Sequence, residues 1–537
     1  MYDYVIAGGG SAGCVLAARL SEDPAHRVCM LEAGPPDDSF FVRMPFGLVA
    51  LMRSHRRNWR FHTAPEPNCA GRRMFWPRGR TLGGSSAVNA MCYTRGHRKD
   101  YDHWAALGND GWGYADVLPY FKRIENRERG ANEFHGVGGP YNVAELRDPN
   151  ALSLAFIEAA IEGGLPRNDD FNGATQEGVG LYEVMQKDGQ RCSNARAFLR
   201  TPGPDGIAPI TRPNLTIITG ARATRVLFEG KHAVGITYRH RGRDSEVRAA
   251  REVLLCGGAI NSPQLLLLSG VGPAAELARH GIPQILELPG VGKNLQDHPD
   301  VLIVHKATRR DGYSLGPLFL WRGAKGLIDY LVRRRGPFTS NIAEAGGFAR
   351  TKPGIGAPDL QYHFLPVIQE NHGLALRRSL GFGYSLHVCV LRPKSRGEIG
   401  LNSADPLADP RIQPNYFADP ADLETLVEGV RAARRILAAP AFNPYRGFEI
   451  FPGNAIRSDA QIEAFIRQRC ETLYHPVGTC KMGIDAMSVV DPELKVHGLD
   501  GLRVVDASVM PTLIGGNTNT PTTMIADKAA EMIRQAC

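Results

Sequence analysis

Four residues near the start of the chain have types and spacing that suit the binding of a dinucleotide. Gly8, Gly10 and Gly13 form a G-x-G-x-x-G motif, and Glu32 follows 19 residues after Gly13. In such a motif the first glycine permits a tight turn, the second lets the backbone approach a pyrophosphate, and the third lets a helix pack closely on a strand. A carboxylate at this spacing accepts hydrogen bonds from ribose hydroxyls. The pattern predicts a dinucleotide site; the alternative is a glycine turn that serves packing alone.

Two further loops rich in glycine and serine favour FAD over NAD. Residues 79–89 (GRTLGGSSAVN) lead into a predicted helix, and residues 258–272 run from a predicted strand into another helix. Three such loops in one chain suit an extended, buried flavin better than a nicotinamide that must leave after each turnover. We therefore expect FAD as the cofactor.

Motifs spread over the whole chain resemble those of the glucose-methanol-choline (GMC) family of FAD oxidoreductases. The resemblance rests on the segments 8–13, 79–96, 258–272, 474–479, 506–508 and 516–519. Within the family, the sequence is most similar to a branch that includes choline dehydrogenases and a membrane-associated alcohol dehydrogenase. The resemblance implies an FAD domain that is discontinuous in sequence and a substrate domain whose sheet covers the flavin.

The resemblance also implies the catalytic residues. His475, in the segment YHPVGT, matches the histidine that the family uses as catalytic base, and Asn517 matches a second active-site position that is His or Asn in family members. Asn519 lies two residues further on, but the spacing back from Lys528 along the last predicted helix favours Asn517. A neutral imidazole can take the hydroxyl proton of an alcohol, and an amide N–H can donate to the oxygen that remains. The flavin N5 would accept the hydride.

The family pattern places the FAD contacts in the glycine loops, at the end of the second strand and near the last helix. The predicted contacts are Gly8, Gly10, Ser11, Gly13, Glu32, Ala33, Gly84, Ser85, Asn89, Ala90, Met91, Val226, Asp506, Ala507, Asn517 and Thr518. Family members that bind FAD covalently through the second loop carry His at the position of Val88. Because valine cannot form that bond, we expect noncovalent FAD.

The resemblance predicts an FAD-dependent alcohol dehydrogenase. It would oxidise a primary alcohol to the aldehyde and pass the electrons to a quinone-type acceptor. Two alternatives stay open. An oxidase would use O₂ with the same pair of active-site residues, and the family also contains hydroxynitrile lyases, which keep FAD but perform no redox chemistry.

Candidate substrate contacts come from one predicted strand of the middle section and from the neighbour of His475. His387 and Cys389 alternate along that strand, and Tyr474 precedes His475. The alternative for His387 and Cys389 is a position in the core or at the sheet edge. The apolar strands of this section favour an aliphatic or aromatic alcohol. Glu344 is the nearest candidate partner for a quaternary ammonium group, so choline is not the favoured substrate.

The predicted elements place these residues in an α/β fold. A strand at 2–7, a helix at 11–20 and a strand at 27–31 form a βαβ unit around the first motif. Later helices are predicted at 85–91, 153–162, 423–438 and 521–533, and later strands at 215–219, 224–228, 233–238, 253–256, 360–364, 384–391 and 502–505. His298, in the segment NLQDH, is expected to be structural.

The order of the elements predicts two interwoven domains. One is a Rossmann-like FAD-binding domain, and the other is an α+β substrate-binding domain built on a sheet. The FAD-binding domain would comprise residues 1–150, 214–300 and 470–537, the last with the catalytic residues. The substrate-binding domain would comprise residues 151–213 and 301–469.

The composition fits a large globular enzyme. The chain has 537 residues, 43% of them hydrophobic, and a net charge of +8, which argues against disorder. The 60 glycines are an excess that fits close approach of the backbone to a cofactor. The charge is too diffuse to predict a nucleic-acid partner. The ten cysteines include no Cys-x-x-Cys pair, and the spacing of Cys470, His475 and Cys480 does not suit zinc, so we expect no metal.

The N-terminal segment lacks the basic region of a secretory signal, and no apolar run approaches the roughly 20 residues of a membrane helix. We therefore expect a cytoplasmic protein. Two stretches mix apolar and basic residues: 319–322 with 327–335, and 48–60. Such stretches could hold the protein at the inner face of the cytoplasmic membrane as a peripheral protein. The alternative is an ordinary solvated surface.

Overall fold

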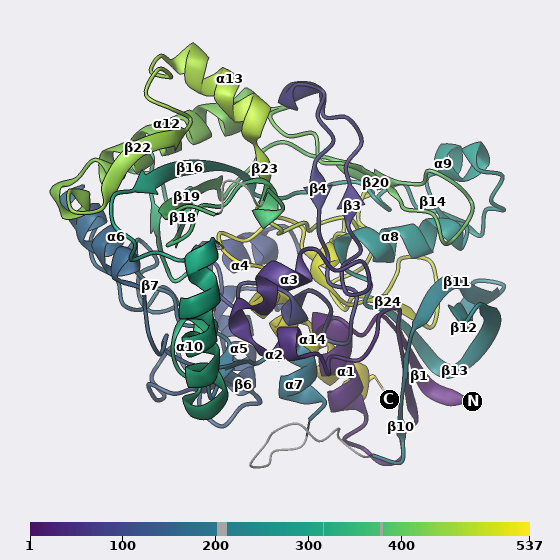
Figure 1. Cartoon of the computed structure of the whole chain (residues 1–537). Helices are drawn as coiled ribbons and strands as arrows, with labels where there is room; N and C mark the ends of the chain where they lie inside the picture. Colours follow the sequence, from purple (N-terminus) through teal and green to yellow (C-terminus); the bar gives the residue numbers. More distant parts are fainter. Residues whose placement is uncertain (201–211, 315, 376–379, 537) are drawn as a thin grey trace.

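The computed structural model describes the chain apart from residues 201–211, 315, 376–379 and 537 and the side chains of residues 317–322. Two seven-stranded sheets form its framework (Figure 1). One hydrophobic core surrounds the N-terminal βαβ unit and the C-terminal helix, and a second lies between the other sheet and the helices that cover it.

The first sheet carries the N-terminal βαβ unit. Its strands run in the order β10 (Leu215–Thr219), β2 (Val28–Glu32), β1 (Tyr2–Ala7), β13 (Arg243–Leu255), β12 (His232–His240) and β11 (Ala221–Glu229), and β24 (Leu502–Val504) also pairs with β13. The strand β13 changes partners along its length: residues 243–248 pair antiparallel with β12, and residues 253–255 pair parallel with β1 and β24. Because parallel strands end at one edge of a sheet, the loops after β1, β2, β13 and β24 meet there.

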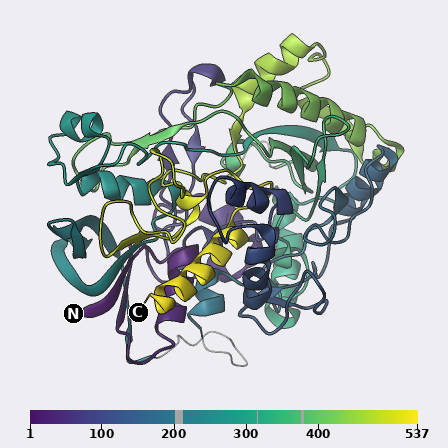
Figure 2. The ribbon, with the colours of Figure 1, turned by 180° about the vertical axis from the view of Figure 1, so that it is seen from behind.

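Three helices begin at or near this edge. They are α1 (Ser11–Leu20), α8 (Gly258–Leu268) and α14 (Asn519–Gln535). The helix α14 crosses the back of the molecule, where it packs against α1 and α5 (Tyr114–Ile124) (Figure 2). The first helix is buried along almost its whole length and consists largely of small and apolar residues, which allows this close packing. Ser11 and Gly258, the first residues of α1 and α8, line one cavity.

The second sheet is mainly antiparallel. Its order is β22 (Arg446–Phe451), β16 (Pro299–Ala307), β19 (Gly383–Val390), β18 (Leu360–Leu365), β17 (Ala345–Ala349) and β7 (Gly178–Leu181), with β23 (Glu471–Thr472) also paired to β16. The helix α12 (Pro420–Leu437) packs on this sheet, together with α6 (Ala151–Glu162) and α13 (Asp459–Arg469). Leu423, Leu426, Val427 and Val430 repeat at helical spacing on the buried side of α12. The Asp419 carboxylate caps its first turn.

Shorter elements complete the chain. The helices are α2 (Phe40–Arg43), α3 (Leu48–Leu51), α4 (Arg98–Ala106), α7 (Asn194–Phe198), α9 (Ala274–Arg279) and α10 (Pro317–Arg333), and the short strands are β3 (Phe61–His62), β4 (Phe75–Trp76), β5 (Glu125–Arg127), β6 (Tyr141–Val143), β8 (Gln186–Lys187), β9 (Gln190–Arg191), β14 (Val271–Gly272), β15 (Leu286–Glu287), β20 (Glu398–Gly400) and β21 (Arg411–Gln413). In Figure 1, α10 stands at the outside of the molecule, near α2 and α3.

The helix predicted at 85–91 is wrong. Only a short 3-10 helix forms, at Gly84–Ala87. A Cβ atom on Gly84 would lie 2.7 Å from the Cα atom of Gly10, so the second loop is pressed against the first glycine motif. Met91 adopts a positive φ of 57°, which an α-helix does not permit. This close contact between two loops prevents a regular helix there.

The mixed α/β fold class is confirmed, and the other predicted helices and strands are present with shifted ends. The first large sheet takes its strands from residues 1–150 and 214–300, with β24, and the second takes nearly all of its strands from 151–213 and 301–469. The remaining strands form separate two-stranded sheets. Two elements cross the predicted limits: β16 starts at Pro299, and β23 joins the second sheet. The domain limits themselves stay a prediction.

Candidate active site

The loop that carries His475 is fixed by hydrogen bonds on both sides. The backbone N–H of His475 donates to the Asp297 carboxylate over 2.8 Å. The backbone of Tyr474, which has a positive φ of 71°, donates to Thr472 Oγ1 over 2.7 Å. The Tyr474 hydroxyl lies 2.6 Å from Nδ1 of His372. His475 is thus held at the wall of a large cavity.

Asn517 lies just before α14 and meets His475 directly. Its amide oxygen accepts hydrogen bonds from Thr94 Oγ1 and Gln361 Nε2, both at 3.1 Å. Its amide nitrogen lies 3.2 Å from Nε2 of His475 and 3.4 Å from Nε2 of His363. The backbone N–H of Asn517 also donates to Thr94 Oγ1, over 2.8 Å. The amide group is therefore clamped with its N–H donors toward the histidines.

Asn519 has a different function in the structure. Its amide oxygen accepts from Ser11 Oγ over 2.7 Å, and its amide nitrogen donates to the Tyr141 hydroxyl over 2.6 Å. These bonds join the start of α14 to the start of α1. The choice of Asn517 over Asn519 as the partner of His475 agrees with this geometry.

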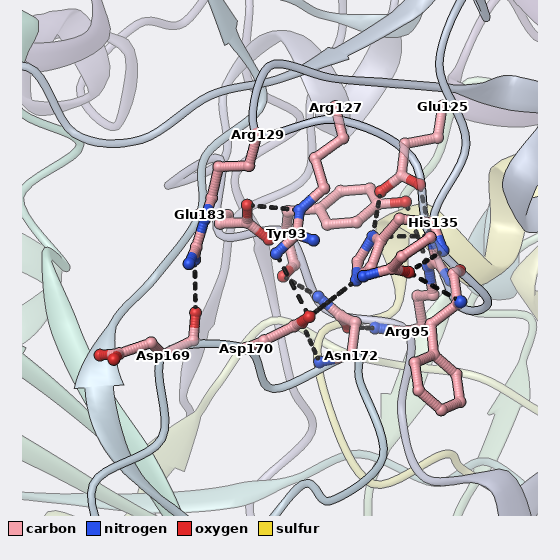
Figure 3. Close-up of polar contacts among 12 residues, drawn as sticks. Tyr93, Arg95, Glu125, Arg127, Arg129, His135, Asp169, Asp170, Asn172 and Glu183 are labelled. Atoms are coloured by element: carbon pink, nitrogen blue, oxygen red, sulfur yellow. Dashed lines mark hydrogen bonds and ion pairs between the residues drawn. The ribbon is translucent and has the colours of Figure 1, made fainter.

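Arg95, which follows Thr94 in the chain, belongs to a buried ionic network (Figure 3). The Arg95 guanidinium donates to Glu125 over 2.7 Å, and the Glu125 carboxylate also contacts His135 at 2.9 Å. The other nitrogen of His135 lies 3.0 Å from Asp170. These contacts fix the chain on one side of Thr94 and hence the position of Asn517.

Burial controls the protonation of the histidines in the site. It lowers the pKa of His475 well below 6.5, and the nearby His298, His363 and Arg78 lower it further. Burial also lowers the pKa of His363 to about 3. Both rings are therefore neutral near pH 7, which leaves His475 able to accept a proton.

Most of the predicted cofactor residues line the same cavity. These are Gly8, Gly10, Ser11, Glu32, Ala33, Gly84, Ser85, Asn89, Ala90, Met91, Asp506, Ala507, Asn517 and Thr518. Gly13 lies behind the wall. A Cβ atom there would be 1.9 Å from the carbonyl oxygen of Gly8, so Gly13 allows α1 to pack on β1, as the motif predicts.

The structure does not bring Val226 into the cavity lining. Its backbone N–H donates to Ser269 Oγ, and its side chain is buried away from the cavity. The first residues of β11, Ala221, Arg222 and Ala223, line the cavity instead. Val226 lies three residues, or about 10 Å, further along the strand than Ala223.

The polar groups that line the cavity fit FAD. The Glu32 carboxylate accepts from the backbone of Gly9 at 3.0 Å and of Gly34 at 2.7 Å and still borders the cavity, where ribose hydroxyls would find acceptors. Burial raises the pKa of Glu32 to about 7. The two backbone hydrogen bonds and the nearby Arg80 act in the opposite direction and lower this pKa. The N-terminus of α1 and the glycine backbone supply a place for phosphates.

The third loop closes this part of the wall through Asp506. Its carboxylate accepts from the backbone N–H of Gly258 at 2.8 Å and from Ser262 Oγ at 2.6 Å. The strand β24 ends just before Asp506, so three chain segments far apart in sequence form one cradle.

Two of the three predicted substrate contacts reach the cavity. Tyr474 and His387 line it, and Nδ1 of His387 lies 2.6 Å from the Asp300 carboxylate. The structure does not bring Cys389 into the cavity lining: its side chain is fully buried in the apolar cluster whose members Ile342 and Leu473 do line the cavity. Although His387 and Cys389 share one face of β19, the cavity ends at His387.

Glu344 lies outside the cavity lining, and both oxygens of its carboxylate are engaged in hydrogen bonds within the protein. Its carboxylate accepts four hydrogen bonds, from the backbone of Asn150 and the hydroxyls of Ser153, Tyr313 and Ser340. Among the described residues that line the cavity, the carboxylates are Glu32 and Asp506, both in the dinucleotide-type loops. No carboxylate of the described lining therefore faces an ammonium group beside His475.

Sequence reasoning missed His363, Gln361 and Arg78. His363 on β18 stands opposite His387 on β19, and its ring stacks on Tyr182 at 5.2 Å. Both strands were predicted, but the sequence does not give the register that pairs the two histidines. Arg78 lines the cavity from the loop before the second glycine segment.

An apolar wall forms the remaining part of the cavity. It comprises Phe46, Leu48, Val49, Met52, Ile342, Leu365, Val367, Ile368 and Leu473. These residues come from the α2–α3 region, from the loop before β17, from the end of β18 and the segment after it, and from the residue before Tyr474. Arg53 donates to the carbonyl of Gly373, which ties the α3 region to the segment after β18. In the described part of the chain, no group of three or more potential metal ligands comes together.

The fold and the site together define a dinucleotide-binding oxidoreductase with a histidine–asparagine pair. Models of the GMC oxidoreductase family match residues 2–300 and 393–526. The chain therefore belongs to the GMC oxidoreductase family, whose members use FAD.

Known proteins of this family are similar along the whole chain. An alcohol dehydrogenase (acceptor) of Pseudomonas putida is 51% identical over 536 residues, which cover 99% of this chain and 96% of the relative. An oxygen-dependent choline dehydrogenase of Paraburkholderia xenovorans is 46% identical and covers 99% and 94%. The crystal structure of pyridoxine 4-oxidase from Mesorbium loti superposes with a TM-score of 0.87 at 32% identity and covers 100% and 99%.

Proposed function

We propose that this protein oxidises a primary alcohol to the aldehyde where His475 and Asn517 meet. The observation that carries the proposal is the 3.2 Å contact between His475 Nε2 and Asn517 Nδ2 at the wall of a cavity that also contains the dinucleotide-type loops. Bound FAD would supply the hydride acceptor. His475 would take the hydroxyl proton, and Asn517 would donate a hydrogen bond to the oxygen as negative charge develops on it.

Addition of alcohol without oxygen tests this reaction. We expect an alcohol to bleach the flavin absorbance of the holoenzyme under anaerobic conditions, and slow recovery of the colour in air would support a dehydrogenase. Fast recovery with formation of peroxide would identify an oxidase instead. An unchanged spectrum across a broad alcohol panel, with hydrogen cyanide released from a cyanohydrin, would contradict the proposal and favour a hydroxynitrile lyase.

The substrate we propose is an uncharged alcohol with an apolar chain or ring. The support is the apolar wall beside His475 and the engagement of Glu344 by four donors away from the cavity. Arg78, which borders the cavity, would repel a quaternary ammonium group. A side-by-side comparison of kcat/KM for medium-chain, benzylic and choline substrates tests this choice. A higher value for choline would contradict it.

We propose noncovalent binding of FAD. Val88 borders the cavity and has no atom that could bond to the flavin. Cys92 also borders it, but burial raises the pKa of this thiol to about 12, so it is not a reactive thiolate near pH 7. Acid precipitation should release FAD into the supernatant, and flavin that stays with the pelleted protein would contradict this prediction.

The acceptor we propose is a quinone-type molecule, reached at the inner face of the cytoplasmic membrane. Five exposed apolar side chains support a surface contact: Phe40, Phe41, Ile328, Leu331 and Val332. The ring centroids of Phe40 and Tyr330 of α10 lie 6.1 Å apart, so α2 lies next to α10, and we term these five exposed residues the α2–α10 patch. Within the described residues, no helix is long and apolar enough to span a membrane.

Only one of the two predicted mixed stretches supports this contact. In 48–60, Leu48, Val49 and Met52 face the cavity, and Arg53 and Arg57 bond to other parts of the chain. In the other stretch, residues 327–335 include exposed apolar and basic side chains, whereas the side chains of 319–322 lie outside the described residues.

A further inference from the structure

The ring of His298 holds His475 from the side away from Asn517. Nδ1 of His298 lies 2.9 Å from Nδ1 of His475, and the two rings are nearly perpendicular, at 89°. Nε2 of His298 lies 3.2 Å from the carbonyl oxygen of Leu391. Because His298 is fully buried, its two nitrogens must satisfy their hydrogen bonds inside the protein.

The Leu391 carbonyl determines which nitrogen of His298 carries the hydrogen. A carbonyl oxygen only accepts, so Nε2 of His298 is the N–H donor. Burial lowers the pKa of His298 to about 3, although hydrogen bonds to the carbonyls of Leu391 and Ile514 raise it. The ring is therefore neutral near pH 7. Nδ1 of His298 is then a bare acceptor. The contact between the two Nδ1 atoms therefore requires a hydrogen on Nδ1 of His475.

Asn517 leads to the same assignment from the opposite side of the ring. Its amide oxygen accepts from Thr94 and Gln361, which leaves the amide nitrogen 3.2 Å from Nε2 of His475. An amide nitrogen only donates, so Nε2 must be the nitrogen without a hydrogen. Two independent neighbours thus select one tautomer of His475, with its lone pair at the cavity.

The charged groups around the pair are few. His363 and Arg78 act on the His475 ring, and both lower its pKa. Asp100 raises and Arg392 lowers the pKa of His298. The Asp297 carboxylate is used by the backbone N–H of His475 and by the Tyr416 hydroxyl, so it binds the loop and not the ring.

We propose that His298 is a positioning residue that fixes the tautomer of His475. The inference rests on the proposed role of His475 as base. In the reaction, the O–H bond of the alcohol breaks and its proton moves to Nε2 of His475, while the electron pair of the α C–H bond leaves as hydride for the flavin. The imidazolium formed would donate from Nδ1 to His298 in a charge-assisted hydrogen bond. Without His298, Asn517 alone favours this tautomer, so a larger share of the rings carries the hydrogen on Nε2 and is then unable to take the proton.

Two substitutions separate the acceptor from the bulk of His298. His298→Asn can present an oxygen near the position of Nδ1, whereas His298→Leu has a similar size but no acceptor. We expect His298→Leu to lower kcat/KM by about tenfold to a hundredfold, and the upper limit is the contribution of a general base. We expect kcat/KM of His298→Asn to stay within about threefold of the native value.

A direct readout of the tautomer does not depend on turnover. In the oxidised holoenzyme labelled with ¹⁵N-histidine, the signals of His475 can be identified by their loss in His475→Asn. Native protein and His298→Asn should show hydrogen on Nδ1 and a bare Nε2. His298→Leu should show a measurable share of rings with hydrogen on Nε2. The control is His305→Leu, at a buried histidine on β16, the strand that pairs with β19. This variant should leave both the His475 signals and kcat/KM unchanged.

The outcomes distinguish this inference from the proposed function. Native-like kcat/KM and His475 signals in a His298→Leu variant that retains FAD would overturn it, as would a loss above tenfold in His298→Asn. If His298→Leu does not retain FAD, His298→Asn decides: near-native kcat/KM with hydrogen on Nδ1 supports the inference, and any other result overturns it. If no alcohol reduces the flavin in the native protein, the proposed function fails first.

Discussion

His475 contacts two nitrogen-bearing side chains, His298 and Asn517, through its ring. An anionic partner would raise the pKa of the ring, whereas these neutral partners leave it low, as burial does. The ring therefore stays unprotonated in the free enzyme, and any proton taken from an alcohol is readily released afterwards. The activity should not fall until the pH lies well below the ordinary histidine pKa of about 6.5.

Removal of this base gives a prediction at the scale of one residue. His475→Ala should retain FAD and lower kcat by about 10² or more, because a positioned general base contributes that much. Kinetics and the flavin spectrum of the purified variant provide the measurement. His62→Ala, at an exposed histidine, serves as the control. Turnover at the native rate in His475→Ala would show that another group takes the proton.

Single residues show where sequence reasoning succeeded and where it stopped. His475 and Asn517 lie in motifs, so their proximity followed from family resemblance. His363 joined the site only through the pairing of β18 with β19, and hydrophobic alternation predicts strands without their register. Val226 and Cys389 were assigned to the wall of the cavity, but the depth along a strand at which a cavity ends depends on packing between distant segments.

Among the elements, the segment around Thr94 positions the catalytic pair through Asn517. Thr94 clamps Asn517, and the neighbouring Arg95 enters the network with Glu125, His135 and Asp170 (Figure 3). Burial by itself lowers the pKa of His135, but hydrogen bonds to Asp170 and Glu125 outweigh it and raise the pKa above 6.5. The protonated ring is thus part of the folded structure.

This network predicts a specific dependence of stability on pH. Since the pKa of His135 is raised in the folded protein, its contribution is complete below about pH 6.5 and is lost as the pH rises through the raised pKa. The Tm of the native protein should therefore fall over that range. His135→Leu should destabilise the protein by about 3 kcal/mol near pH 6, as loss of a buried charged partner does, and should flatten this slope.

Thermal unfolding at several pH values, followed by circular dichroism of the FAD-bound protein, measures the effect. The control is His62→Leu, an exposed histidine, which should keep the native slope. An unchanged slope in His135→Leu would show that other groups cause the pH dependence.

The elements themselves were predicted best where the sequence pattern is local. The βαβ unit and α14 follow from periodicity and glycine motifs, and their limits differ from the predicted ones by at most two residues. The helix expected at 85–91 does not form, because the contact of Gly84 with Gly10 overrides the local preference of the sequence for a helix. Such contacts join segments more than 70 residues apart, and no local pattern encodes them.

At the scale of the whole molecule, the α2–α10 patch predicts binding to anionic membranes. Its apolar side chains are joined by the exposed basic residues Lys325, Arg333 and Arg335. A buried large apolar side chain contributes about 1.5–3 kcal/mol, and a basic residue near an anionic surface about 1 kcal/mol. The native protein should therefore sediment with vesicles that contain phosphatidylglycerol more than with vesicles of phosphatidylcholine alone.

The double variant Leu331→Asp with Val332→Asp should weaken vesicle binding by about tenfold or more while the flavin is still reduced by alcohol. Ile484→Asp, at another exposed apolar residue outside the patch, is the matched control and should bind as the native protein does. Equal binding of the double variant and the control would contradict the assignment of this surface.

The partner change along β13 has a consequence for the order of biosynthesis. Its last residues pair with β1 on one side and with β24 on the other, and β24 leads to Asp506, Asn517 and α14. During synthesis on the ribosome, the cavity that suits FAD lacks one wall until nearly the whole chain has emerged. The flavin must therefore be captured late, by a chain that has already made the segment from β24 to the start of α14.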